Sequence, residues 1–223
     1  MISLKVFLAV MTLSFMSLHA VADESSVNHK PNGDYNYIQI GLTSTTEATP
    51  ICAGTECYKT LTGAELTASL NFPSAPYLVI SASSSSQGAS GANSNLTSSA
   101  GKLLIGLIGG FGPVDAEVSV SNLSADILTC PNGSNICQDV LYNGVDFGGM
   151  AKLWFGSENN FNVGATVDRY SYSASSSTYI DSSIFASWLP ARHHSLAISY
   201  NSTININHTS VSTGGTVSYA YLF

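Results

Sequence analysis

Hydrophobic and polar residues alternate with a period of two along much of this chain. The clearest run covers residues 195–206, where Leu196, Ile198 and Tyr200 alternate with serine, alanine and asparagine. Residues 64–72 alternate as regularly between apolar even positions and polar odd positions. Because successive side chains of a β-strand point to opposite faces, this pattern predicts strands with one apolar and one polar face. The chain is therefore expected to be all-β.

Ten such strands are predicted along the chain. They are expected at about residues 35–45, 64–72, 77–84, 102–111, from 117 onward, 147–156, 161–168, 179–189, 195–206 and 215–223. Eight strands remain an alternative, because the third and fourth segments alternate least clearly. The phase of the fifth strand shifts near Asn122, and this shift predicts a β-bulge.

The last predicted strand ends the chain on an aromatic residue. Val217, Tyr219, Tyr221 and Phe223 share one parity of the segment 215–223. This ending resembles the C-terminal signal of bacterial outer-membrane β-barrel proteins, which closes on Phe after apolar or aromatic residues at alternate positions. The resemblance implies a transmembrane antiparallel β-barrel in the outer membrane of a Gram-negative bacterium. It also implies insertion by the barrel-assembly machinery, with these four residues as the assembly signal.

The connections between the predicted strands alternate between short turns and longer segments. One longer segment carries Cys52 and Cys57, and another covers residues 129–146. Residues 83–100 are almost entirely Ser, Gly, Ala and Asn, so we expect a mobile loop there. Such alternation is typical of transmembrane barrels, which have short periplasmic turns and long external loops.

The start of the chain has the pattern of a secretory signal peptide. Lys5 precedes an apolar run at residues 6–18, and the small residues at 20–22 match a signal-peptidase site. The run is shorter than the roughly 20 residues that a membrane helix needs. We therefore expect residues 1–22 to be removed on export. Residues 23–223 are then expected to form a single barrel domain that begins with a polar lead-in.

The composition is consistent with this interpretation. Charged residues make up only 9% of the chain, and its formal net charge is −7. So few charges are atypical of a soluble surface, and the acidic balance argues against a nucleic-acid partner. We expect a monomer whose partners are outer-membrane lipid and small solutes. The competing class is a soluble, secreted β-sandwich adhesin, whose strands would show the same alternation.

The four cysteines fall into two close pairs. Cys52 lies near Cys57, and Cys130 lies near Cys137. In an exported protein, close cysteine pairs are expected to form disulfides. A shared zinc site is the alternative, but it would require thiolates from two distant loops, and the spacing is wider than in common zinc sites.

Histidines next to hydroxyl residues are candidate catalytic groups. His193 and His194 precede Ser195 at a predicted turn, and His208 lies in a predicted external loop. A histidine can activate a hydroxyl group, so a barrel-type lipid or peptide hydrolase remains an alternative. The omptin proteases, also ten-stranded barrels, carry Asp-x-Asp and Asp-x-His pairs, and this sequence contains neither. We expect no enzymatic activity, no metal and no cofactor.

The polar parity places several charged residues inside the expected barrel. Glu65, Lys152, Asp168 and Asp181 are the predicted lumen charges, with Arg169 as a further candidate. These charges are interpreted as ion pairs across a narrow lumen or as a selectivity ring.

On the second, seventh, ninth and tenth predicted strands, the inward residues are mostly Ser, Thr, Asn, Gly and Ala. The few bulky inward residues are Tyr37, Met150, Trp154 and Phe185. Ten strands lie close to the number at which side chains fill a barrel, but small polar walls leave space for water. We therefore expect a narrow solute conduit with a weak preference for cations, and external loops that serve surface interaction.

Overall fold

The computed structural model describes residues 31–33, 35–53, 55–73, 77–131, 137–156, 158–173 and 177–223. The predicted signal peptide at residues 1–22 lies outside these ranges. The ten strands are β1 (Tyr37–Ala53), β2 (Glu56–Phe72), β3 (Tyr77–Ser90), β4 (Ser94–Phe111), β5 (Val114–Pro131), β6 (Gln138–Phe155), β7 (Phe161–Tyr172), β8 (Thr178–Ala191), β9 (His194–Asn205) and β10 (Ser210–Leu222). No helix in the described ranges is long and apolar enough to cross a membrane.

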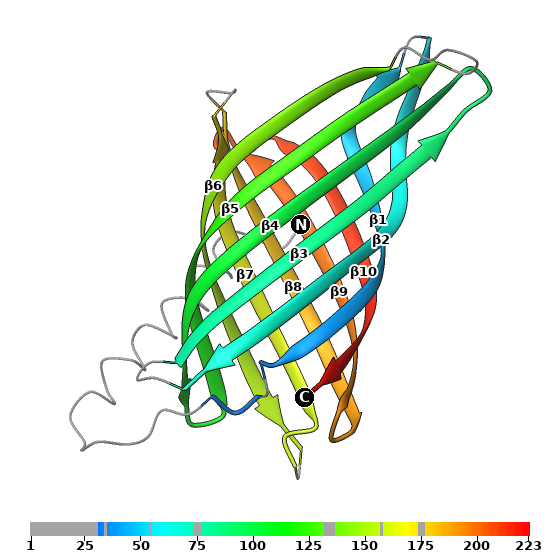
Figure 1. Cartoon of the computed structure of the whole chain (residues 1–223). Helices are drawn as coiled ribbons and strands as arrows, with labels where there is room; N and C mark the ends of the chain where they lie inside the picture. Colours follow the sequence, from blue (N-terminus) through cyan, green and yellow to red (C-terminus); the bar gives the residue numbers. More distant parts are fainter. Residues whose placement is uncertain are drawn as a thin grey trace.

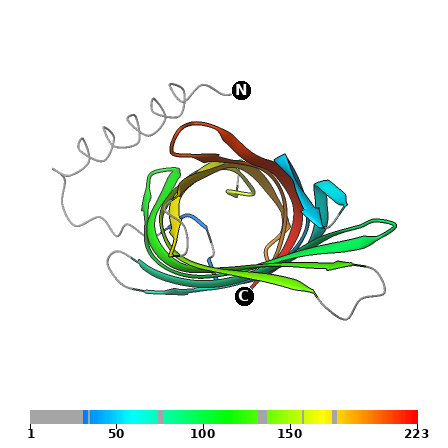
Figure 2. The same cartoon turned by 90° about the horizontal axis from the view of Figure 1, so that it is seen from above.

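The ten strands form one closed antiparallel barrel (Figures 1 and 2). Each strand pairs with its neighbours in sequence, and β1 closes the ring on β10 from Tyr37↔Leu222 to Glu47↔Ser212. This closure confirms the predicted barrel and excludes both the eight-stranded and the sandwich architectures. We call the end that carries the two disulfides the hairpin end, and the end where β1 begins and the chain stops at Phe223 the terminal end.

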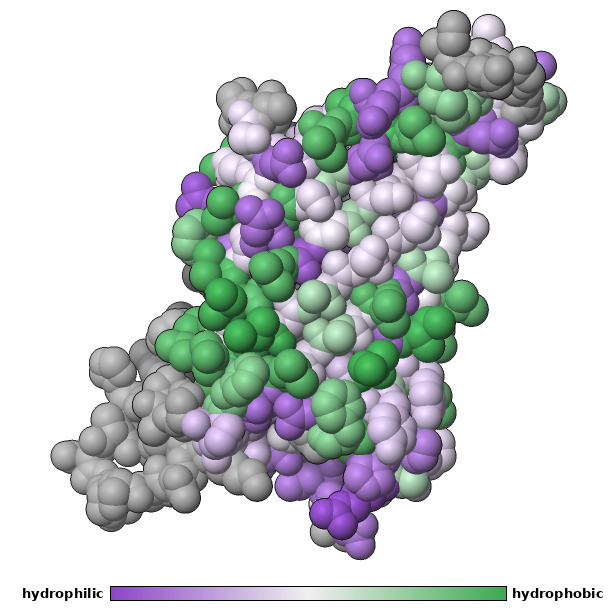
Figure 3. Space-filling model, viewed as in Figure 1, coloured by the Kyte–Doolittle hydropathy of each residue, from purple (hydrophilic) through white to green (hydrophobic). Residues whose placement is uncertain are grey.

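The barrel is apolar outside and polar inside. Val118 and Val217 are each 62% exposed on the outer face, and Ile198 is 61% exposed. In Figure 3, hydrophobic residues gather around the middle of the visible face, and hydrophilic residues lie mainly towards both ends. Burial of apolar surface is the main driving force of folding in water. Since this outer surface is unburied in the single chain, the fold is that of a barrel surrounded by lipid.

Two segments that were predicted as long loops are strands. Residues 83–100 belong to the hairpin of β3 and β4, which stays paired up to Ser90↔Asn95. Most of segment 129–146 belongs to β5 and β6, which pair from Thr129↔Gln138. Ser, Gly and Asn have low β-propensity, but pairing within each hairpin supplies hydrogen bonds to the backbone groups that face the partner strand. The exposed apolar residues around the middle of the outer face, such as Val118, Ile198 and Val217, form what we call the apolar belt. The strands continue beyond this belt as protruding hairpins (Figure 1).

The β-bulge predicted near Asn122 is also absent from the structure. The pairing of β5 with β6 runs without interruption from Ser121↔Asp146 to Leu123↔Gly144. The apparent phase shift has another cause, since the outward residues change from valine to asparagine and serine where the strand leaves the apolar belt. Even-numbered residues of β5 therefore stay on the outer face, but just beyond the apolar belt these outward positions are polar.

Both predicted disulfides form within their own hairpins. Cys52 of β1 is bonded to Cys57 of β2, and Cys130 is bonded to Cys137 across the β5–β6 hairpin. The first pair sits at directly opposite positions of the strand ladder. The two bridges therefore close the tips of two protruding hairpins, and none of the four thiols is available for zinc.

Candidate functional site

The interior of the barrel is the candidate functional site. Inward side chains of several strands surround a cavity of about 380 Å³. Glu65, Lys152 and Asp168 line this cavity. Asp181 lies on the inward parity of β8 and accepts a hydrogen bond from Thr203 at 2.9 Å. Arg169 instead lies exposed on the outer face of β7, because it follows an inward residue directly.

Four more charged residues face the interior and were not among the predicted lumen charges. They are Lys102, Asp115, Glu117 and Asp146. The alternation pattern did not identify Lys102 as inward, because the fourth predicted strand is apolar at both odd and even positions. It did not identify Asp115 or Asp146, because these residues were assigned to a turn and to a loop. Counting by twos from outward valines of β5 would have placed Asp115 and Glu117 inside.

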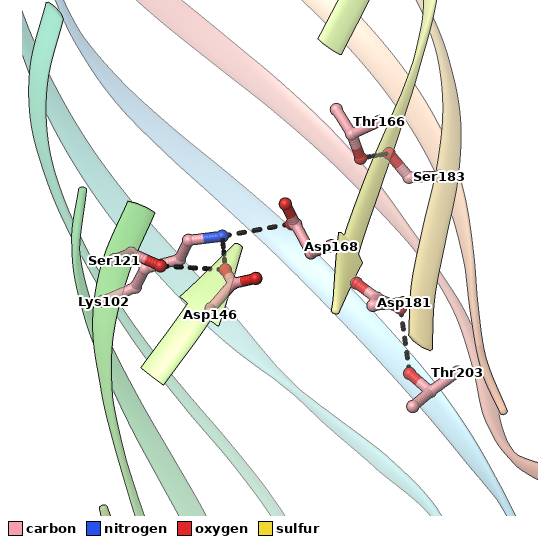
Figure 4. A network of polar contacts seen from close by, with 8 residues as sticks. All are labelled: Lys102, Ser121, Asp146, Thr166, Asp168, Asp181, Ser183 and Thr203. Atoms are coloured by element: carbon pink, nitrogen blue, oxygen red, sulfur yellow. Dashed lines mark hydrogen bonds and ion pairs between the residues drawn. The ribbon is translucent and has the colours of Figure 1, made fainter. Parts of the chain in front are cut away.

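An ion-pair network crosses the middle of the lumen (Figure 4). The Lys102 ammonium group contacts the carboxylate of Asp146 and lies 3.1 Å from that of Asp168. Ser121 donates a hydrogen bond to Asp146 Oδ2 at 2.8 Å. Asp146 is only 2% exposed, and its Oδ1 has no hydrogen-bond partner among the described residues. One cation thus lies between two carboxylates, which leaves this level of the lumen acidic.

The segment that precedes β1 enters the lumen at the terminal end and narrows it. Asn32 donates two hydrogen bonds to Asp115 Oδ1, at 2.8 and 2.9 Å, and the Gly33 amide donates to Oδ2 at 3.1 Å. The Tyr35 hydroxyl and the Trp154 indole NH donate to the same oxygen, at 2.8 and 2.7 Å. Asp115 is completely buried and therefore anchors this segment. Figure 2 shows the segment inside the ring of strands.

Apolar residues pack around this anchor. Tyr35, Val79 and Ile108 form a buried cluster that also contacts Tyr77 and Met150. The sequence had indicated only a few bulky inward side chains, which proves incorrect at the terminal end. The N-terminal segment adds its own side chains to those of the wall and occupies part of the lumen at that end, where the cavity is also lined by Leu189 and Leu222.

Lys152 stands beside the anchor without a carboxylate partner. Its ammonium group lies 4.6 Å from the centre of the Tyr35 ring, 5.3 Å from that of Trp154 and 5.7 Å from that of Phe185. Aromatic faces attract cations, so these rings stabilise the charge partially. Lys152 forms no ion pair among the described residues.

Four tyrosines gather on the inward parity of β6, β7 and β8 towards the hairpin end. Tyr142, Tyr170, Tyr172 and Tyr179 have ring centroids 5.3 to 6.2 Å apart in their contacting pairs. They lie beyond Asp146 and Asp168 along their strands. The lumen is consequently narrowed by aromatic rings on this side of the ion-pair network.

The histidines make contacts at the rim of the barrel. His193 Nδ1 lies 2.9 Å from the carbonyl oxygen of Leu222, and His194 Nδ1 lies 2.6 Å from the Tyr219 hydroxyl. His208 lies in the β9–β10 turn at the opposite end, with a positive φ of 61°. The described residues contain no group of three potential metal ligands. His208 thus lies at the opposite end of the barrel from His193 and His194.

An apolar exterior, a charged interior and complete closure define a transmembrane β-barrel. Ail, the attachment invasion locus protein of Yersinia pestis, is similar over 85% of this chain and 99% of its own, with 10% identity and a TM-score of 0.43. The translocator domain of the autotransporter NalP from Neisseria meningitidis is similar over 98% of both chains, with 10% identity and a TM-score of 0.47. The outer membrane protease OmpT from Escherichia coli is similar over 90% of this chain and 99% of its own, with 11% identity and a TM-score of 0.47.

All three are bacterial outer-membrane β-barrels, and the similarity concerns the barrel fold alone. At such identities and TM-scores the likeness assigns no substrate, partner or activity, so the description of this fold rests on its own strand pairing. No protein-family model matches the sequence, and no curated protein matches it.

Proposed function

We propose that this protein is a non-enzymatic outer-membrane barrel whose lumen is a narrow conduit for small solutes, with a weak preference for cations. The hairpin end would face the exterior of the cell and the terminal end the periplasm, because transmembrane barrels have short periplasmic turns and long external loops. The N-terminal segment would restrict the conduit at the periplasmic end until it moves.

The outer-membrane location is supported by the apolar belt. Backbone groups cannot remain unpaired in lipid, and a closed barrel satisfies all of them by strand pairing. Partition into the outer-membrane fraction and heat-modifiable migration on a gel would test the location. Extraction by carbonate without detergent would contradict it.

One observation carries the cation preference, and it is the charge balance of the lumen. From the ion-pair network to the terminal end, six carboxylates and two ammonium groups of the described residues face the interior, which leaves a formal excess of four negative charges there. They are Glu65, Asp115, Glu117, Asp146, Asp168 and Asp181 against Lys102 and Lys152. Rings of acidic side chains favour cations in channels, and salt weakens this preference by screening the charges.

The test is the reversal potential of the purified, folded protein in planar bilayers under a potassium chloride gradient. We expect a cation-selective potential that decreases at high salt. Lys102→Met should increase the cation selectivity, because it removes the positive charge between Asp146 and Asp168, and Lys102→Arg should preserve it. Absence of conductance, also after the N-terminal anchor is released by Asp115→Ala, would refute the conduit.

A surface-interaction role is a second candidate, and the protruding hairpins favour it. Val140 and Leu141 of β6 are 45% and 60% exposed beyond the apolar belt. Contiguous patches of exposed apolar side chains mark interaction sites on protein surfaces. Binding of cells that display the barrel to host or neighbouring cells, compared with Val140→Ser and Leu141→Ser variants, would test this role.

A further inference from the structure

We propose that the lumen cavity binds a small zwitterion, a molecule that carries one ammonium group and one carboxylate, such as an amino acid. This inference deepens the proposed conduit and rests on it for a biological role, since the cavity lies along its path. The binding itself requires no conduction. The argument depends on which charges of the cavity wall are already paired.

The cavity is lined by charges of both signs that form no direct ion pair among the described residues. Lys152 lies over aromatic rings, as described above, and attracts Asp115 and Glu117 only at longer range. Glu65 accepts one long hydrogen bond from Gln39, at 3.4 Å, and neither Glu65 nor Glu117 forms an ion pair among the described residues. A charge removed from bulk water requires compensation. Two carboxylates and one ammonium group in the same cavity therefore favour a ligand with both charges.

Glycines keep the two glutamates against the wall. A Cβ atom at Gly41 would lie 2.9 Å from the Glu65 Oε1 atom, and one at Gly106 would lie 2.9 Å from the Glu117 Oε1 atom. Both distances are shorter than a van der Waals contact. Any larger residue would push the carboxylates towards the centre of the barrel, so these glycines preserve the space in which a ligand would fit.

A neutral polar group in the same cavity also lacks a partner. Asn162 lines the cavity and is only 2% exposed, and its Oδ1 has no hydrogen-bond partner among the described residues. Most buried polar atoms in proteins are hydrogen-bonded. An ammonium group supplies three donors, so a ligand amine would suit this oxygen as well as the glutamates.

The size of the cavity agrees with a small ligand. Its volume of about 380 Å³ lies at the lower end of the range of roughly 300–1,000 Å³ that is common for ligand pockets. The Tyr35 and Trp154 rings beside Lys152 offer an apolar surface next to the expected carboxylate site. A molecule of a few carbons between its two charges is the best match to these features.

Binding is measured with the full barrel, purified and folded in detergent, and with 4-aminobutanoate as the probe. The chain has two tryptophans, and Trp188→Phe removes the one on the outer face, so that Trp154 in the cavity wall becomes the only reporter. Butanoate and butylamine carry the same carbon chain with one charge each. We expect 4-aminobutanoate to bind at least tenfold more tightly than either.

Variants of the charged wall separate this site from unspecific binding. Lys152→Met should weaken 4-aminobutanoate at least tenfold, and Lys152→Arg should restore most of the affinity. Glu65→Gln and Glu117→Gln should each weaken it, while Lys59→Met, on the exposed β1–β2 hairpin, should have no effect. Heat-modifiable migration confirms that each variant is folded, and equilibrium dialysis with labelled 4-aminobutanoate replaces fluorescence where Trp154 gives no signal.

Equal affinity for the zwitterion and its singly charged analogues would overturn the proposal, and so would unchanged affinity in Lys152→Met. The outcome is independent of the conduit. A barrel that binds the probe without conductance refutes the conduit and retains the site. A barrel that conducts without binding refutes the site and retains the conduit.

Discussion

Among single residues, Asp115 makes the largest set of side-chain hydrogen bonds described in the lumen. Its carboxylate accepts five hydrogen bonds, four of them from the segment 32–35 and one from Trp154. A buried carboxylate without a cation partner is stable only when its oxygens are saturated with donors. The residue therefore joins the N-terminal segment to the wall of the barrel.

Asp115→Ala should release this segment. It leaves the Trp154 indole, the Tyr35 hydroxyl and two backbone amides without an acceptor, so we expect the free energy of unfolding to fall by about 2–4 kcal/mol. The conductance in bilayers should rise, because this segment no longer narrows the terminal end. Denaturant titration measures the first effect. Asp126→Ala, on the protruding β5–β6 hairpin, serves as the control, and equal behaviour of the two variants would contradict the anchoring role.

Glu56 has a comparable role outside the lumen, at the tip of the β1–β2 hairpin. Its carboxylate accepts hydrogen bonds from the backbone amides of Asn93 and Ser94, at 3.0 and 2.9 Å, and from the hydroxyls of Ser94 and Tyr58. Desolvation raises the pKa of Glu56, but these bonds outweigh it and hold the pKa below its ordinary value. The contact joins the tip of one hairpin to the β3–β4 turn.

This contact should depend on pH. Since the folded state lowers the pKa of Glu56, its stabilising effect is complete above the unfolded value of about 4.3 and is lost as the pH falls through the folded value. We expect the amides of residues 93 and 94 to lose protection from hydrogen exchange at pH 3, after correction for intrinsic rates. Glu56→Gln should show little protection at either pH. Equal protection of the native protein at both values would contradict the role of the carboxylate.

At the scale of elements, the strands outlast the apolar belt. β4 and β5 each contain 18 residues, whereas a tilted strand needs only about 9–11 to cross a bilayer. Beyond the belt, apolar side chains at alternate positions are no longer stabilised by lipid. Pairing with neighbouring strands keeps the backbone extended there. The disulfides sit at the tips of these extensions, where pairing is least supported.

Loss of a disulfide should therefore act locally. The double variant Cys130→Ser and Cys137→Ser should lose about 2 kcal/mol of stabilisation on the chain-entropy estimate for so short a loop. The β5–β6 tip should become sensitive to protease while the barrel keeps its heat-modifiable migration. Cys52→Ser with Cys57→Ser is the matched variant on the other hairpin. Loss of the folded band in either variant would show that the bridges support the barrel itself.

At the scale of the whole molecule, closure depends on the last strand. β10 pairs with β9 on one edge and with β1 on the other. Phe223 follows this strand, is 51% exposed on the outer parity and donates its amide hydrogen to the carbonyl oxygen of Asn36. The end of the chain thus meets its beginning at the terminal end of the barrel.

Phe223→Ser should lower the fraction of assembled barrel and leave export intact, if the terminal aromatic residue serves as the predicted assembly signal. Pulse-chase labelling with heat-modifiable migration measures the assembled fraction, and periplasmic accumulation reports export. Phe155→Ser, also on the outer face near the terminal end, is the control. Unchanged assembly of the Phe223 variant would contradict the signal.

The period-two pattern determined most of the architecture. The period-two alternation of neighbouring residues predicts the number of strands and the outward position of residues such as Ile198 and Val217. The short spacing of the cysteines likewise predicts their pairing within hairpins. Parity of this kind is local, because it depends only on the direction of successive side chains. The inward position of Glu65, Lys152 and Asp168 follows from the same rule.

Tertiary structure alone decided what those inward side chains meet. Lys102 pairs with Asp146 and Asp168 from two other strands, and such contacts depend on strand tilt and stagger, which parity does not encode. Residues 83–100 are extended because they pair with neighbouring strands. The β-propensity of the individual residues does not include this pairing. The entry of residues 31–35 into the lumen depended on Asp115, about 80 residues away. Contacts across a closed ring arise only when the ring exists, and for that reason the chain pattern specified the wall but not the contents of the lumen.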